Sequence, residues 1–391
     1  MKKSKEYILK VAKEYFNVDS IVDIRQLTSG HINNTFMVTF PECRYILQQI
    51  NHNVFKSPFG VMNNMVLLTN HIMRKCVYDG KSRNRAGLNL VSTRYDQWVA
   101  IVDNEYYRCM EYIEGGVCYE QLTDPQLFFE VGRAVGNFHY MLYDFHSRLI
   151  DDPIVDFHNT PKRYINFMKL VEQKRKEDPE LIESVKDEIN FIVERKGALD
   201  EIVNKLEDKT IKRRVCHNDT KLSNVMLDEK TGHYMCLIDL DTAMKGAIAY
   251  DFGDALRGGA STALEDEVDL SKVGINLDFV RKFSNGFLLE LKGKKDTTGT
   301  YHEYISKEEV KTLYSGFRLI TIELGMRFLE DYIAGNIYFK INDDRPQHNL
   351  ERAKNQLALA LCVEQNKESI IDIINEALIE YDYPEEYIIK D

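Results

Sequence analysis

The first part of the chain begins with a helical pattern of apolar side chains and continues with strand patterns. Apolar positions on one face predict an amphipathic helix over residues 5–17. Ser57 and Pro58, a cap followed by proline in the first turn, predict a second helix over residues 58–75. Short apolar runs predict strands over residues 21–27, 35–40, 45–49, 97–102 and 106–110. This part of the chain is therefore expected to be rich in β-strands.

The later part of the chain carries mostly helical patterns. Capped prolines predict helix starts at Asp124-Pro125 and at Thr160-Pro161. Helical patterns then continue to about residue 380, except in the segment from 211 to about 260. A strand-rich part followed by a helix-rich part predicts an α+β fold with two lobes.

The boundary between the two lobes is expected where extended chain gives way to Gly115 and Gly116. Residues 1–113 would form a small β-rich lobe, and residues 114–391 a large, mainly helical lobe. A chain of 391 residues is long enough for each lobe to have its own core.

Charge and cysteine content narrow the class of partner and the compartment. The net charge of −11 argues against nucleic acid or an anionic membrane as the main partner. Seven cysteines, with no C-x-x-C pair, are typical of free and mostly buried thiols in a reducing compartment. The start of the chain is charged and no 18-residue apolar run exists, so we expect a cytoplasmic protein without a membrane span.

The segment from His217 to Asn224 reads H-x-D-x-x-x-x-N, which is the spacing of a kinase catalytic loop. In that reading Asp219 accepts the proton of the acceptor hydroxyl. Asn224 and Asp239, an acid at the end of an apolar strand, hold Mg²⁺ on the phosphates of ATP. The motif alone is weak, and a hydrogen-bonded loop aspartate is the alternative for Asp219. The order of loop, hairpin and acid strengthens the kinase reading.

A second candidate for the metal ligand is the triplet Asp251-Phe252-Gly253, which spells the DFG of protein kinases. It follows Asn224 by 27 residues, whereas Asp239 follows it by 15, which a two-strand hairpin spans comfortably. We therefore assign the metal to Asp239. Asp241 is a possible second ligand, because it would share a face with Asp239 in an extended segment. Asp251 is expected to accept hydrogen bonds that fix the catalytic loop, and His217 to hold that loop.

Two loops of the first lobe are candidates for nucleotide contacts. Residues 28–34 contain Ser29 and Gly30, and small residues between two strands can lay backbone N–H groups over phosphates. With one glycine, an ordinary hairpin turn is the alternative. Glu111 and Ile113 lie in the turn between the predicted lobes, where a kinase hinge meets adenine.

Longer stretches resemble known enzymes. Residues 215–225, 238–242 and 250–254 of this chain resemble the aminoglycoside phosphotransferase and choline kinase superfamily. Four further stretches, at residues 30–36, 45–49, 259–267 and 325–329, resemble the N-acetylhexosamine 1-kinases. The likeness covers roughly residues 20–370. Members of the second group phosphorylate the anomeric hydroxyl of N-acetylglucosamine and N-acetylgalactosamine with ATP and Mg²⁺.

The resemblance implies a bilobal protein kinase-like fold and a monomer that binds ATP, Mg²⁺ and a sugar. Asp219 would be the base on the C1 hydroxyl. His31 and Asn33 would reach the sugar from the first lobe, and Arg327 and Tyr338 would complete the sugar pocket. The alternatives are a helix-surface cation for Arg327, a core aromatic for Tyr338 and a hydrogen bond within its own loop for His31.

Two positions depart from the expected pattern. Gln48 stands where kinases carry a lysine on the third strand, and residues 61–68 lack the glutamate that pairs with it. Loss of both partners is self-consistent, since a lone buried glutamate is costly. Gln48 can still donate a hydrogen bond to phosphate, without charge. Gly258 stands where phenylalanine is expected, which predicts broad tolerance among 2-acetamido sugars.

The main hypothesis is an ATP-dependent N-acetylhexosamine 1-kinase, and two alternatives stay open. One is a kinase for another small acceptor, such as an aminoglycoside, choline or methylthioribose. The acidic stretch at residues 265–269 could bind a cationic acceptor, or it could be a solvated helix face. The other is a pseudokinase that binds without transfer, for which Gln48 is the only support.

Overall fold

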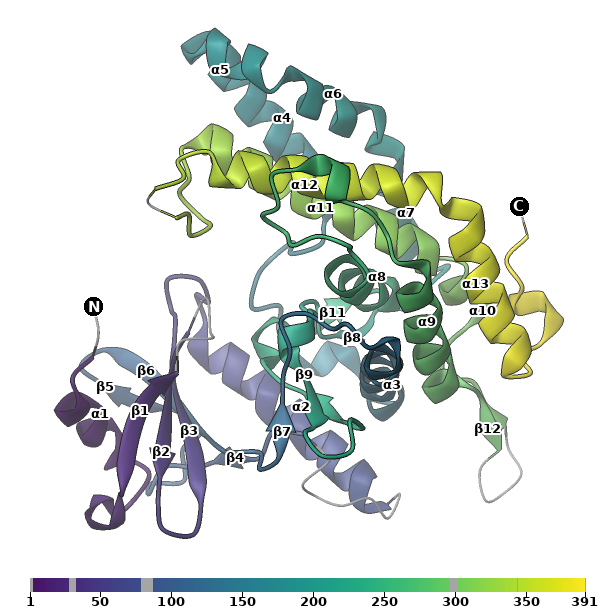
Figure 1. Cartoon of the computed structure of the whole chain (residues 1–391). Helices are drawn as coiled ribbons and strands as arrows, with labels where there is room; N and C mark the ends of the chain where they lie inside the picture. Colours follow the sequence, from purple (N-terminus) through teal and green to yellow (C-terminus); the bar gives the residue numbers. More distant parts are fainter. Residues whose placement is uncertain (1–2, 28–32, 79–86, 296–300, 343, 391) are drawn as a thin grey trace. The chain divides into compact units, whose positions relative to one another are not determined.

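The structure is a computed structural model of the whole chain, and it describes residues 3–27, 33–78, 87–295, 301–342 and 344–390 (Figure 1). The chain divides into two compact units. Unit 1 comprises Met1–Val117, Asp144–Val155 and Met226–Lys245. Unit 2 comprises Cys118–Tyr143, Asp156–Val225 and Gly246–Asp391. Each unit therefore contains segments that lie far apart in the sequence, whereas the functional division into lobes at residues 113 and 114 stays a prediction.

The main feature of unit 1 is a six-stranded antiparallel sheet, with the order β1-β2-β3-β6-β4 and with β5 also on β6 (Figure 1). Its strands are β1 (Asp23–Leu27), β2 (Asn34–Thr39), β3 (Arg44–Ile50), β4 (Leu90–Val91), β5 (Ala100–Val102) and β6 (Glu105–Glu111). Apolar side chains from one face, including Val38, Leu47 and Tyr107, are fully buried. The strands predicted from the apolar runs are confirmed, within a few residues at their ends.

Two helices accompany this sheet in unit 1, α1 (Lys5–Ala12) and α2 (Pro58–Tyr78). Helix α2 begins at the predicted proline, and the hydroxyl of Ser57 accepts from the backbone N–H of Gly60 at 3.2 Å. Helix α1 ends earlier than predicted. After Ala12 the N–H groups of Glu14 and Tyr15 bond to carbonyls three residues back, and the side chain of Asn17 then caps a separate 3₁₀ turn by accepting from the N–H of Asp19 at 3.3 Å.

The buried side chain of Asn64 in α2 joins the three segments of unit 1. Its amide nitrogen donates to the carbonyl oxygen of Asp151 at 2.9 Å and to that of Ala243 at 3.2 Å. Its amide oxygen accepts from the N–H of Asp151 at 2.9 Å. One side chain therefore satisfies buried backbone groups of both later segments.

A second sheet of unit 1 carries the strand that precedes Asp239. Its order is β10-β9-β7, formed by β7 (Gly116–Val117), β9 (Val225–Asp228) and β10 (Tyr234–Leu237). The carboxylate of Asp228 closes the turn between β9 and β10 by accepting from the N–H groups of Lys230 and Thr231. The predicted hairpin between the catalytic loop and Asp239 is confirmed.

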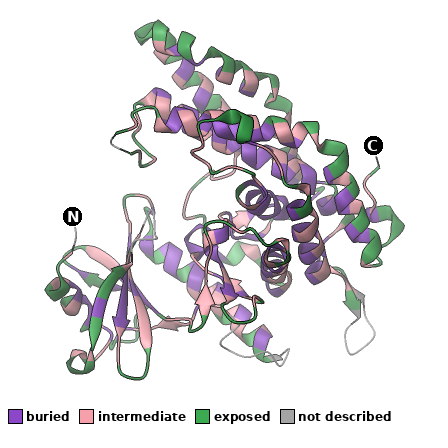
Figure 2. Ribbon diagram, in the orientation of Figure 1, coloured by how far each residue is buried: buried purple, intermediate pink, exposed green. Residues whose placement is uncertain are grey.

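Unit 2 is mainly helical. Its helices are α3 (Pro125–Met141), α4 (Thr160–Glu177), α5 (Pro179–Ser184), α6 (Lys186–Glu194), α7 (Lys196–Glu207), α8 (Ile248–Gly259), α9 (Leu277–Leu291), α10 (Lys307–Val310), α11 (Leu313–Ala334), α12 (His348–Gln365) and α13 (Lys367–Glu380). Four further short strands are β8 (Arg214–Cys216), β11 (Met244–Gly246), which begins in unit 1, β12 (Lys294–Lys295) and β13 (Tyr301–His302). Figure 2 shows that α8 and α11 are buried along most of their length.

Two details of unit 2 bear on the sequence prediction, and helix α4 begins at Thr160-Pro161 as predicted. The cap of α4 is Asn159, whose side chain accepts from the N–H of Lys162 at 3.2 Å, and the hydroxyl of Thr160 instead donates to the carbonyl of Leu199. The DFG triplet lies inside α8 and forms no metal-binding loop. A Cβ on its glycine, Gly253, would lie 2.5 Å from the backbone of Gly316, so the two glycines allow α8 and α11 to pack backbone to backbone.

The cysteines and the hydropathy of the helices can be compared with the sequence prediction. All seven cysteines are free. Cys76, Cys109 and Cys216 are buried, Cys43 is exposed and the others are partly buried, so fewer thiols are buried than predicted. Within the described residues, no helix combines the length and the apolar character needed to cross a bilayer.

Candidate active site

The candidate catalytic loop lies in unit 2, directly after β8, and a buried carboxylate holds its backbone. Asp251 in α8 accepts from the N–H of His217 and from the N–H of Asn218, each at 2.7 Å. The hydroxyl of Thr220 donates to the carbonyl of Asp251 at 2.7 Å. Asn218 has a left-handed backbone, with φ of 62°, and these contacts stabilise that conformation. The ring of His217 is fully buried and lies edge-on to Phe138.

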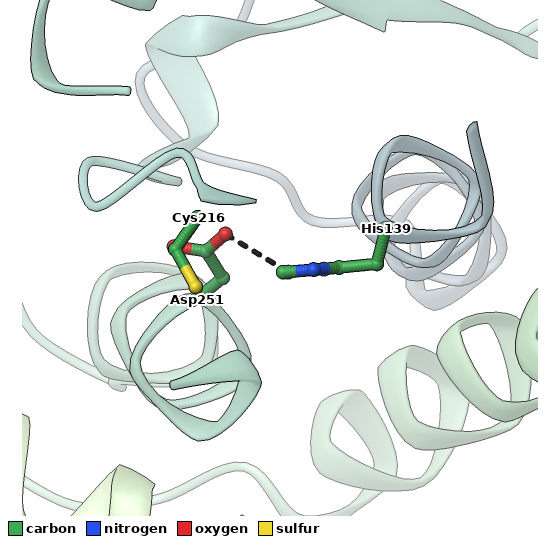
Figure 3. Close-up of side chains that lie close together, drawn as sticks. All are labelled: His139, Cys216 and Asp251. Carbon is green, nitrogen blue, oxygen red and sulfur yellow. Dashed lines mark ion pairs between the residues drawn. The ribbon is translucent and has the colours of Figure 1, made fainter. Parts of the chain in front are cut away.

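Asp251 also belongs to a cluster with His139 and Cys216 (Figure 3). His139 Nε2 forms an ion pair with Asp251 Oδ2 at 2.9 Å. Burial raises the pKa of the Asp251 carboxyl, but His139 and the loop N–H groups outweigh it and hold that pKa below its usual range. Burial, with Asp251 nearby, raises the pKa of the Cys216 thiol. A protonated thiol and a carboxylate already engaged by donors indicate a brace for the loop and not a metal site.

The candidate base, Asp219, lies beside two donors of its own loop. Its Oδ2 accepts from Lys221 Nζ at 3.0 Å and from Asn224 Nδ2 at 2.9 Å. Asn224 Nδ2 also donates to the carbonyl of Asp219 at 2.9 Å. Burial raises the pKa of the Asp219 carboxyl, but Lys221 and His217 outweigh it, so the pKa is lowered. The carboxylate is therefore ionised at neutral pH, as a proton acceptor must be.

Lys221 was not singled out from the sequence, although its place two residues after Asp219 is a usable signal. We expect Lys221→Met to move the acidic limb of the kcat/KM profile to higher pH. Without the lysine, less positive charge stabilises the carboxylate, so Asp219 protonates at a higher pH and the base is lost earlier on acidification. A pH profile of turnover would test this, with Lys230→Met in an exposed turn as the control. An unshifted limb would contradict the pairing.

In unit 1, Asp239 follows β10 and has a left-handed backbone, with φ of 62°. The prediction of an extended segment after Asp239 is wrong, because Leu240–Thr242 form a 3₁₀ turn. Asp241 in that turn is buried, and both of its oxygens accept from donors: Oδ1 from Arg108 Nη1, and Oδ2 from Asn33 Nδ2 at 2.6 Å. These contacts favour a structural role for Asp241 over that of a second metal ligand.

Gln48 on β3 also contacts Arg108. Gln48 Oε1 accepts from Arg108 Nε at 2.9 Å and from Nη2 at 2.6 Å. Gln48 Nε2 donates to the hydroxyl of Thr35 at 3.0 Å. The expected direct donation from Gln48 to phosphate would therefore compete with the contact to Thr35. Arg108, which the sequence interpretation missed, places a positive charge beside the position of the absent lysine.

Of the other residues of unit 1 that were predicted to bind nucleotide or sugar, the structure describes only some. Ser29, Gly30 and His31 lie outside the described residues. Asn33 Oδ1 accepts from the backbone N–H of Asn51 at 2.9 Å, in addition to the contact of its amide nitrogen with Asp241.

The hinge candidates lie at and just after the end of β6. Glu111 is the last residue of the strand, and Ile113 follows it in chain without regular structure. The side chain of Glu111 accepts from Asn89 Nδ2 at 2.9 Å. Their contact with adenine stays a prediction.

The two candidate sugar residues of unit 2 lie close together. The guanidinium of Arg327 is 5.3 Å from the ring centre of Phe157, 5.3 Å from that of Phe339 and 6.0 Å from that of Tyr338. Tyr338 is 57% exposed, so the alternative of a core aromatic is wrong. Asp331 fixes this segment by accepting from the backbone N–H of Tyr338 at 2.7 Å.

The acidic stretch at residues 265–269 is neither a helix face nor an unpaired patch. Glu265 accepts from Arg257 at 3.2 Å and from Arg352, and Asp266 forms an ion pair with Arg345 at 3.3 Å. Burial raises the pKa of the Glu265 carboxyl, but the two arginines outweigh it and lower that pKa. These partners reduce the negative charge that the stretch could offer to a cationic acceptor.

Comparisons with known proteins agree with this fold. The chain has the α+β architecture of a kinase-like small-molecule phosphotransferase. It belongs to the Phosphotransferase enzyme family, whose model matches residues 23–274.

Solved structures share this fold over nearly the whole chain. An aminoglycoside phosphotransferase from Alicyclobacillus acidocaldarius has a TM-score of 0.58 and 14% identity, over 92% of this chain and 95% of that one. A microcompartment-associated aminopropanol kinase has a TM-score of 0.58 and 16% identity, over 94% and 98%. A spectinomycin phosphotransferase in complex with ADP and spectinomycin has a TM-score of 0.52 and 12% identity, over 93% and 100%. At these identities the similarity shows the fold.

Proposed function

We propose that the protein transfers the γ-phosphoryl group of ATP to the anomeric C1 hydroxyl of N-acetylhexosamines, giving sugar 1-phosphates. The observation that carries the transfer is the position of the Asp219 carboxylate between Lys221 and Asn224, in a loop that Asp251 braces. Asp219 accepts the proton of the C1 hydroxyl. The oxygen of that hydroxyl bonds to the γ-phosphorus, and the bond between the γ-phosphorus and the leaving oxygen of ADP breaks. Lys221 stabilises the carboxylate before the transfer.

The donor chemistry fits magnesium. Carboxylate and amide oxygens are ligands that Mg²⁺ prefers. In this proposal Asp239 and Asn224 are its protein ligands. Because Asn224 Nδ2 donates to Asp219, its amide oxygen is the atom that it would offer to the ion. Bound magnesium would neutralise charge on the phosphates. Asp241 is the weaker candidate, since both of its oxygens already accept from donors.

The sugar preference rests on Arg327 and its aromatic neighbours together with the resemblance described above. An arginine beside an exposed tyrosine ring can donate to a sugar or acetamido oxygen while the ring packs on the sugar. The partners of Glu265 and Asp266 make a cationic acceptor less favourable. A Cβ at Gly258 would meet no atom within 4 Å, so open space is present at the position where phenylalanine was expected. Such space supports tolerance among acetamido sugars.

The test is ADP release by the purified protein with ATP and Mg²⁺ over a panel of acceptors. We expect turnover with N-acetylglucosamine and N-acetylgalactosamine, well above that with glucose, galactose, choline or kanamycin. The product phosphate should be acid-labile and alkali-stable, as expected for an anomeric phosphate. Turnover with choline or kanamycin alone would keep the catalytic residues and overturn the sugar assignment. The absence of any acceptor-dependent turnover would favour a binding-only protein.

A further inference from the structure

The inference concerns the positive charge that holds the phosphates of ATP. Kinases place it on a lysine of the third strand, which pairs with a glutamate of the following helix. Here Gln48 occupies that strand, and α2 contains no acidic residue. Arg108 on β6 is the direct cross-strand partner of Gln48. Directly opposed residues of antiparallel strands point to the same face, so Arg108 brings its charge to the face on which the lysine would lie.

The contacts of Arg108 hold its guanidinium in one orientation. Nε and Nη2 donate to Gln48 Oε1, and Nη1 donates to Asp241 Oδ1. Gln48 is itself held by donation to Thr35. These contacts use three of the five N–H bonds of the guanidinium. No acceptor among the described residues is paired with the other two, although the side chain is only 1% exposed.

Burying an arginine costs free energy unless its charge is paired. Asp241 balances the charge, and Gln48 replaces the donor of the usual arrangement by an acceptor that suits a neighbouring cation. An arginine side chain is long, and its planar group can bind phosphate through two parallel N–H bonds. The exchange of lysine for glutamine is therefore matched by the arginine beside it.

We propose that Arg108 is the phosphate-binding cation of this protein and replaces the lysine of the third strand. Gln48 orients the guanidinium, and Asp241 balances its charge when no nucleotide is bound. Asn33 donates to the second oxygen of Asp241 at 2.6 Å and so helps to hold this carboxylate beside Arg108. The inference rests on the proposed phosphotransferase function, and it concerns nucleotide binding alone.

The first experiment compares the binding of ATP, with and without Mg²⁺, and of adenosine to the full chain, by calorimetry. The variant Arg108→Gln/Asp241→Asn removes both charges together, so neither is left buried alone. We expect ATP to bind roughly tenfold to hundredfold more weakly in both conditions, the loss typical of one charged hydrogen bond, with adenosine unchanged. Equal ATP affinity in the double variant and the wild type would overturn the inference.

The second experiment moves the charge back to the third strand. Gln48→Lys/Arg108→Gln keeps one cation beside Asp241, and we expect it to recover most of the ATP affinity lost in the first variant. Arg25→Met, on the exposed face of β1, is the control. If this variant binds ATP no more tightly than Arg108→Gln/Asp241→Asn does, the result counts against the inference. Because no acceptor is present, failure of the sugar assignment leaves these results intact, whereas a wild type that binds no ATP would overturn both proposals.

Discussion

Asp219→Asn is expected to lower kcat by about 10³-fold to 10⁴-fold, the range in which a positioned general base contributes. Asparagine keeps the shape of the side chain and can still contact Lys221 and Asn224 through its amide oxygen. It cannot accept the proton of the attacking hydroxyl. Since the carboxylate acts in the transfer and not in holding the nucleotide, the affinity for ATP should change by no more than about threefold.

Single-turnover kinetics and ATP titration of the same preparation would separate these two effects. Asp208→Asn is the matched control, because Asp208 lies in an exposed turn of the same unit and accepts from the N–H of Thr210 at 2.8 Å. Near-normal turnover in the Asp219 variant would remove the base assignment. Loss of ATP binding together with turnover would instead indicate that the loop has changed shape.

Asp251→Asn is expected to destabilise the fold by about 3–5 kcal/mol, which is typical when one partner of a buried ion pair is removed. The carboxylate accepts from two loop N–H groups and pairs with His139. Asparagine offers one acceptor oxygen in place of two. Denaturant unfolding followed by circular dichroism would measure the loss. An unchanged midpoint would contradict the role of Asp251 as the brace of the loop.

The same variant carries a pH signature. The pKa of Asp251 is lower in the folded protein than its usual value, so its contribution to stability is present above the unfolded pKa. That contribution is lost as the pH falls through the folded pKa. The wild type should therefore lose stability on acidification more steeply than Asp251→Asn. Asp187→Asn, on an exposed face of α6, should follow the wild type at every pH.

Local sequence patterns were enough to predict most of the secondary structure. Apolar runs predicted β1, β2, β3, β5 and β6, and proline caps predicted the starts of α2 and α3. These signals act over a few residues, through side-chain spacing and backbone capping, so they survive in the folded chain. The candidate catalytic loop was also predicted in this way, because its spacing is a property of one short segment.

Predictions failed where a local competitor or a distant partner decided the conformation. Helix α1 ends at Ala12 in i→i−3 turns, ahead of the 3₁₀ turn that Asn17 caps, and the extended segment expected around Asp241 is also a 3₁₀ turn. Residues 265–269 form no helix, and arginines from other elements pair with Glu265 and Asp266. Sequence spacing does not show such partners, because they come from segments far along the chain.

The sequence by itself determined the class of the protein, the candidate catalytic motif and the absence of the usual lysine. Only the tertiary structure decided what accompanies that absence, because β3 and β6 lie far apart in the chain and their register alone places Arg108 opposite Gln48. It also decided the role of the DFG triplet, where Asp251 holds the loop and Gly253 packs against Gly316. Pairing between distant segments depends on global packing, which no local pattern of residues encodes.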